Sequence, residues 1–142
     1  MAVVNFKKLS TSGFDEDALT TTTPGEHLLN FGALTTTGDL ANGIFASAND
    51  VTVRNFGDIE TAGLGAAGIY VQGDNARIEN YGSVHTTGDF TEDELYFSEG
   101  LFAEGNGFLH CQFRHHSDRG FVRNRPGRGW RRRRRCQLRS GG

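Results

Sequence analysis

A 25-residue period runs through residues 3–108 and constrains the fold more than any other feature of this sequence. It is carried by an asparagine column, an aliphatic column four residues later, a threonine column six residues later and a glycine column eight residues later. The columns are Asn5, Asn30, Asn55 and Asn80; Leu9, Leu34, Ile59 and Val84; Thr11, Thr36, Thr61 and Thr86; and Gly13, Gly38, Gly63 and Gly88. Such a period is typical of repeat proteins, in which each unit buries its apolar face against its neighbours.

Within one repeat, apolar and polar residues alternate, which indicates β-strands rather than helices. In segment 53–61, Val53 and Ile59 share one parity and the charged residues take the other, so one face is buried and one is solvated. We interpret this segment as one strand that Gly63 terminates, and we expect a second short strand at 68–71. Glycines are expected at the corners between strands, because corners often require positive φ.

Two or three short strands per repeat predict an all-β, right-handed parallel β-solenoid of about four turns over residues 1–108. In a solenoid, equivalent positions stack at the strand spacing of ~4.8 Å. The side-chain amides of Asn5, Asn30, Asn55 and Asn80 can then hydrogen-bond from turn to turn as a ladder. The alternative is that asparagine simply suits the corner backbone. Neither interpretation makes these residues catalytic.

Two aromatic columns share the same period. The first directly follows the asparagine column and the second lies in the second strand: Phe31, Phe56 and Tyr81; Phe45, Tyr70 and Phe102. If the alternation continues through the corners, both columns point outward and offer an interface to another subunit or to a carbohydrate. A bend at the Asn-Phe-Gly corner would instead turn the first column into the core. We predict a homo-oligomer that forms through these columns or through the open ends, where unpaired strand edges invite association.

An acidic insertion, residues 89–99, interrupts the third repeat between Gly88 and Gly100. Insertions in solenoids often carry binding. Its carboxylates could offer oxygen ligands to calcium, but their spacing is neither that of an EF-hand nor that of a glycine-aspartate nonapeptide. The carboxylates are Asp89, Glu92, Asp93 and Glu94. We therefore expect a solvated loop, and we predict no metal and no cofactor.

A catalytic interpretation would rest on charged residues of the outward parity. Glu60 and His85 fall in the same register of adjacent turns, as do Arg54 and Glu79, with Asp58 nearby. Such a group could serve as general acid and base, as in a lyase acting on a polysaccharide. Cross-strand neighbours of this kind are more often surface ion pairs. We predict that the protein is not an enzyme.

The tail, residues 109–142, breaks both the repeat and the charge balance. Residues 1–108 hold 4 basic and 16 acidic residues, whereas the tail holds 11 arginines, one aspartate and both cysteines. The run Arg131, Arg132, Arg133, Arg134 and Arg135 predicts non-specific, salt-dependent contact with nucleic acid or another polyanion. Back-translation offers a different origin, because codons read one base later allow the repeat to continue at the same spacing. We therefore predict that the tail is irregular and out of frame.

The pattern Val/Ile-x-Asn-x-Gly-x-Ile-x-Thr-x-Gly followed by Gly-Ile-x-Val/Ala, as in residues 53–71, resembles repeats in the passenger regions of bacterial autotransporters and related surface adhesins. The resemblance covers residues 3–108 and implies a large parent protein that is secreted or displayed on the cell surface, with a structural or adhesive role. The sequence itself has no signal peptide and no membrane segment. As written, it is therefore expected to be a cytoplasmic fragment.

Overall fold

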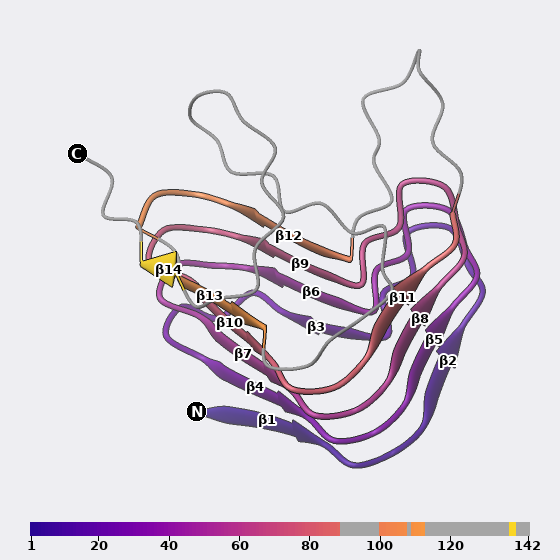
Figure 1. Ribbon diagram of the computed structural model, residues 1–142, viewed down its shortest axis with the longest axis horizontal. Helices are drawn as coiled ribbons and strands as arrows, with labels where there is room; N and C mark the ends of the chain where they lie inside the picture. The colour runs from indigo at the N-terminus through magenta and orange to yellow at the C-terminus, as the bar shows by residue number, and fades with distance from the viewer. Residues whose placement is uncertain (89–99, 108, 113–136, 139–142) are drawn as a thin grey trace.

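The computed structural model describes residues 1–88, 100–107, 109–112 and 137–138, and the regular elements in this part of the chain are all β-strands. They form a parallel β-solenoid of about three turns (Figure 1), which confirms the predicted fold class, although about four turns were expected. The right-handed sense of the coil stays a prediction. No helix among the described residues is long and apolar enough to cross a membrane.

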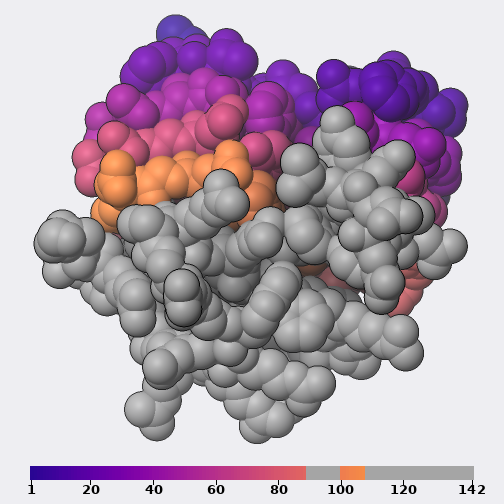
Figure 2. All heavy atoms as spheres, turned by 90° about the horizontal axis from the view of Figure 1, so that it is seen from above, coloured from indigo at the N-terminus to yellow at the C-terminus, as the bar shows by residue number. Residues whose placement is uncertain are grey.

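Each turn contributes one strand to each of three sheets, which we call A, B and C. Sheet A contains β1 (Ala2–Asn5), β4 (His27–Asn30), β7 (Thr52–Asn55), β10 (Arg77–Asn80), β13 (Leu109–Gln112) and β14 (Gln137–Leu138). Sheet B contains β2 (Leu9–Thr11), β5 (Leu34–Thr36), β8 (Ile59–Thr61) and β11 (Val84–Thr86). Sheet C contains β3 (Leu19–Thr21), β6 (Ile44–Ser47), β9 (Ile69–Gln72) and β12 (Leu101–Glu104). Figure 2 shows the successive turns as layers, from the first residues in indigo to β12 in orange.

The strands stack in the register that the 25-residue period predicts. Asn5 pairs with Asn30, and Asn55 pairs with Asn80, so equivalent residues lie directly above one another. The insertion 89–99, which lies outside the described residues, falls between β11 and β12. Parallel pairing nevertheless resumes afterwards, because β12 pairs with β9 and β13 pairs with β10. The stack thus includes the first residues of the segment that the sequence assigns to the tail, and β14 then pairs antiparallel with β13.

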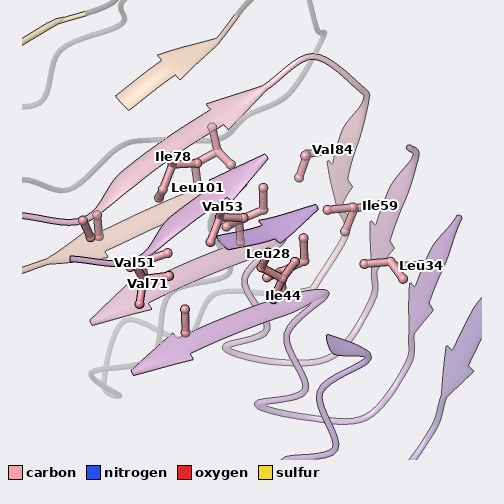
Figure 3. Packing of buried hydrophobic residues seen from close by; sticks show 14 residues of the cluster. Leu28, Leu34, Ile44, Val51, Val53, Ile59, Val71, Ile78, Val84 and Leu101 are labelled. Atoms are coloured by element: carbon pink, nitrogen blue, oxygen red, sulfur yellow. The ribbon is translucent and has the colours of Figure 1, made fainter. Parts of the chain in front are cut away.

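The core fills the space between the three sheets (Figure 3) with columns of aliphatic side chains from every sheet. The columns are Leu28, Val53 and Ile78 from sheet A; Leu34, Ile59 and Val84 from sheet B; and, from sheet C, both Ile44, Ile69 and Leu101 and Ala46, Val71 and Ala103. All of these side chains are buried. Their removal from water is the main favourable contribution to folding, and no single turn could achieve it alone.

The alternation suggested that segment 53–61 is one strand, but the structure divides it into two. The strand β7 ends at Asn55 and β8 begins at Ile59, with a corner between them. The alternation continues through this corner, because Asn55 and Gly57 are buried while Phe56 is exposed. The Asn55 amide faces inward and donates to the carbonyl oxygen of Gly57 at 2.8 Å, which holds the bend. The chain therefore changes sheet without changing which parity faces the core.

The recurring glycine eight residues after each ladder asparagine has a different cause from the one expected. A Cβ atom on Gly63 would overlap the carbonyl oxygen of Gly38 in the turn below. Close backbone stacking, rather than positive φ, therefore demands glycine there. Positive φ occurs two residues later instead, at Asp15, Leu40 and Gly65, with values of 55°, 59° and 67°.

Candidate functional site

The asparagine column forms a continuous ladder inside the corner between sheets A and B. Each Nδ2 donates to the Oδ1 of the asparagine one turn later, at 2.8 Å in all three steps from Asn5 to Asn80. Each Nδ2 also donates to the carbonyl oxygen two residues further along its own corner, at 2.8–3.1 Å. The column is therefore both a turn-to-turn ladder and a set of residues suited to the corner backbone. The hydrogen bonds join the turns to one another and shape each corner, which is a structural role.

The first aromatic column points outward, and the alternative of an inward bend is wrong. Its rings stack at centroid distances of 4.8 Å between Phe31 and Phe56 and between Phe56 and Tyr81, with interplanar angles of 4°. The column has a further member, Phe6, 5.0 Å from Phe31. Phe6 was not predicted as a member, although it directly follows Asn5 as Phe31 follows Asn30. Because the rings cover one another's faces, mainly their edges and the outer face of Phe6 remain for a partner.

The second aromatic column lies on the outer face of sheet C and is arranged differently. Neighbouring rings are tilted by 51° between Phe45 and Tyr70 and by 50° between Tyr70 and Phe102. All three are partly exposed. The Tyr70 hydroxyl donates to Oε2 of Glu104 at 2.9 Å. Burial and this carboxylate raise the pKa of Tyr70 above its usual range, so the phenol remains a hydrogen-bond donor at neutral pH. This column thus places polar groups beside ring surfaces.

Two of the charged residues proposed from register, Arg54 and Glu79, form an ion-pair network with Arg77 on sheet A. Arg54 Nε lies 2.5 Å from Oε2 of Glu79, and Arg77 contacts the other carboxylate oxygen. Burial alone would raise the pKa of Glu79, but the two guanidiniums outweigh it and hold the pKa below its usual value. Glu79 is therefore ionised and paired at neutral pH, which suits an ion pair better than a proton carrier.

The remaining members of the catalytic alternative lie on or beside sheet B. Glu60 and His85 are in register on β8 and β11, as the period predicts. Asp58 lies in the corner before β8, and its carboxylate accepts a hydrogen bond from the Ser83 hydroxyl. Glu60 and His85 are thus neighbours on adjacent strands, but this arrangement does not by itself define a reaction.

The corner between sheets B and C carries side-chain hydrogen bonds that were not predicted from the sequence. Asp17 Oδ1 accepts from the backbone N–H of Asn42 at 2.6 Å, and Asn42 Oδ1 accepts from the N–H of Ala67 at 2.9 Å. The threonine column stabilises the same corner, because the Thr36 hydroxyl donates to the Ala41 carbonyl oxygen at 2.7 Å. Asp and Asn residues spaced by 25 could have revealed this pattern.

The first turn differs from the others in ways that bear on end-to-end association. Lys7 occupies a position that is glycine in the later turns, and a Cβ on Gly32 would overlap the Lys7 carbonyl oxygen below it. The Lys7 side chain would therefore meet the same obstacle in a further turn stacked beneath it. The backbone N–H of Lys7 donates to Oδ1 of Asn5 at 3.0 Å. A second copy stacked on this end would have to accommodate the Lys7 side chain, and association through the open ends stays a prediction.

Several predicted sites lie outside the described residues. They are the insertion carboxylates Asp89, Glu92, Asp93 and Glu94, and the run Arg131–Arg135. Within the part of the chain that the structure describes, no group of three or more His, Cys, Asp or Glu residues is placed to hold a metal ion. The calcium and polyanion interpretations therefore stay predictions.

Comparison with protein-family models, with curated proteins and with solved structures gives no match for this chain. The resemblance to autotransporter passenger repeats consequently rests on the repeat pattern alone. The structure establishes the parallel β-solenoid that this resemblance implies.

Proposed function

We propose that this chain is a structural segment of a bacterial surface or secreted protein: a rigid stalk that presents its outer columns to partners and catalyses no reaction. The observation that carries the proposal is the unbroken asparagine ladder, in which every turn is hydrogen-bonded to the next through buried amides. Such a ladder resists sliding or separation of the turns, because breaking one step leaves buried polar groups without partners.

Native-state hydrogen exchange tests the rigidity of the full chain. We expect the backbone amides of β4, β7 and β10 to exchange only through a shared opening, with one common dependence on denaturant. Independent exchange of each turn within minutes would contradict a stalk role. A variant that breaks one ladder step, such as Asn55→Asp, has a matched control in Asn49→Asp, because Asn49 lies in an exposed corner outside the ladder.

We also propose that the outward aromatic columns mediate self-association. Phe6, Phe31 and Phe56 are 73%, 44% and 41% exposed, which is unusual for neighbouring large apolar side chains on an isolated monomer. Sedimentation velocity over a hundredfold range of concentration should reveal a dimer or larger species. A single monomeric boundary throughout would reject this part of the proposal.

Carbohydrate binding is a second candidate, and the tilted column on sheet C favours it. Tyr70 and Phe102 offer ring surfaces, while Glu104 offers a hydrogen-bond acceptor for sugar hydroxyls. Binding to a panel of polysaccharides should fall with Tyr70→Ala and remain with Phe31→Ala. Equal loss in both variants, or no binding, would remove this candidate.

The catalytic alternative has its own test. Turnover of a polyuronide that disappears with Glu60→Gln would support a polysaccharide lyase rather than a binding protein.

A further inference from the structure

Three exposed rings, Phe6, Phe31 and Phe56, and the outward residues two positions after each of them are arranged symmetrically about the second turn. We propose that a second copy of the chain docks on this corner in antiparallel orientation, with a two-fold axis between the two copies of the Phe31–Ala33 segment. The inference rests on the proposed self-association and specifies its geometry. It concerns the edges of the stacked rings and the outward residues directly beside them.

The exposed aromatic side chains are centred on Phe31. Phe6 lies one turn before it and Phe56 one turn after it, and both stack on Phe31 with nearly parallel planes. An antiparallel two-fold arrangement places Phe6 of each copy against Phe56 of the other, and Phe31 against its own counterpart. Burying three aromatic side chains per copy supplies the apolar centre that stable interfaces require.

The outward column two residues further on carries complementary charges about the same centre. Its first three members are Lys8, Ala33 and Asp58, one per turn, and Ser83 follows in the fourth turn. Their stacking follows from the backbone hydrogen bonds from Leu9 to Ala33 and from Leu34 to Asp58. The same two-fold axis therefore places Lys8 of each copy against Asp58 of the other, and alanine against alanine at the centre, where a small side chain permits close approach.

Charge also determines the orientation. In a parallel pair the two-fold axis would run along the coil. The charge columns would then oppose Lys8 to Lys8 and Asp58 to Asp58 if the axis passed between them, and would lie on opposite sides of the interface if it passed between the rings. Like charges opposed across an interface are unfavourable, whereas opposite charges steer the partners into one register. The charges of Lys8 and Asp58 thus favour the antiparallel pair. The Lys7 side chain disfavours addition of a copy at the end of the coil.

Charge reversal tests the pairing in the full chain with both cysteines replaced, Cys111→Ser and Cys136→Ser. We expect Lys8→Glu and Asp58→Lys each to weaken dimerisation about tenfold, and the double variant to recover most of the loss. Phe31→Ser should weaken it roughly thirtyfold, as for a central aromatic anchor. Failure of the double variant to recover would overturn the charge pairing. Circular dichroism of each variant verifies that the solenoid remains folded.

Disulfide trapping tests the axis. In the same background, Ala33→Cys should cross-link two copies on mild oxidation, because position 33 faces itself. Ser83→Cys, two turns later in the same column, should not, since its counterpart would lie beyond the other copy's first turn. Efficient cross-linking of both variants would indicate parallel copies and overturn the proposal. A dimer that traps neither variant would overturn the geometry while leaving self-association intact, and absence of any dimer would remove both.

Discussion

The substitution Asn55→Asp removes the donor function of one ladder amide while keeping the shape of the side chain. Asn55 is fully buried, and its amide group makes three hydrogen bonds. Its Nδ2 donates to Gly57 O and to Asn80 Oδ1, both at 2.8 Å, and its Oδ1 accepts from Asn30 at 2.8 Å. Aspartate retains the acceptor for Asn30 but brings an oxygen against two other oxygens.

The expected cost follows from these contacts. Each lost hydrogen bond removes about 1 kcal/mol, and each buried acceptor left without a donor adds about 1–3 kcal/mol. Two such losses destabilise the fold by roughly 4–8 kcal/mol, before any penalty for the buried carboxylate charge. A domain with typical stability of about 5–15 kcal/mol would unfold or become marginal.

Asn49→Asp makes the same chemical change at an exposed corner, where only the acceptor is used. Asn49 Oδ1 accepts from the N–H of Asp74 at 2.9 Å, and aspartate can accept the same bond. The equivalent position one turn later is itself aspartate, Asp74, which accepts from the N–H of Asn106 at 2.9 Å. We expect Asn49→Asp to change the free energy of unfolding by less than about 0.5 kcal/mol.

Urea unfolding followed by far-ultraviolet circular dichroism measures both variants against the parent chain. At pH 7 only Asn55→Asp should lose stability. Its deficit relative to the parent should shrink at acidic pH, because a protonated aspartate regains one donor. If Asn55→Asp lies within 1 kcal/mol of Asn49→Asp at pH 7 (about the cost of one ordinary hydrogen bond), the ladder does not stabilise the fold as argued.

Three further outcomes are expected. Gly63→Ala should destabilise the fold by more than about 2 kcal/mol, because its Cβ meets backbone, whereas Gly25→Ala, with φ of 71° and open space around it, should cost only about 1 kcal/mol; equal losses in thermal unfolding would contradict the steric argument. Leu40→Asn should raise stability by about 0.5 kcal/mol, because asparagine tolerates φ of 59° better; an unchanged or lower urea midpoint would contradict this. The pKa of Glu79 is lowered in the folded state, so its contribution is present above the ordinary value of 4.5 and is lost as pH falls through the folded pKa. Arg54→Gln should reduce this acid-dependent loss in a pH series of urea titrations, and an unaltered profile would contradict it.

The sequence predicted the repeat, the register and the buried parity because these properties depend on residues that recur every 25 positions. Each amide of the asparagine column meets its equivalent one turn later, and the side-chain periodicity of two survives the corners. The corner inside segment 53–61 could not be predicted in the same way. Alternation does not distinguish a straight strand from two strands joined by a bend that preserves parity, as at Asn55.

The surface was predicted less completely, because its properties depend on orientation rather than on periodicity. Both aromatic columns have the same spacing, yet the rings at Phe31 and Phe56 stack while those at Phe45 and Tyr70 are tilted. The sequence did not indicate that Glu79 would be only 3% exposed while on the outward parity. Two arginines contact its carboxylate there.

The polarity of the ladder limits how copies of this chain can associate. Every step donates from the earlier turn to the later one, so only head-to-tail stacking could extend it. At the first turn, the Asn5 acceptor is already engaged by the Lys7 N–H, where the equivalent N–H of Gly57 bonds to the backbone of the turn below. A second copy at that end would have to displace the Lys7 side chain and use the remaining lone pair of Asn5 Oδ1. Association along the outer corner requires neither, which is why the aromatic column, rather than the end of the coil, is the surface to test.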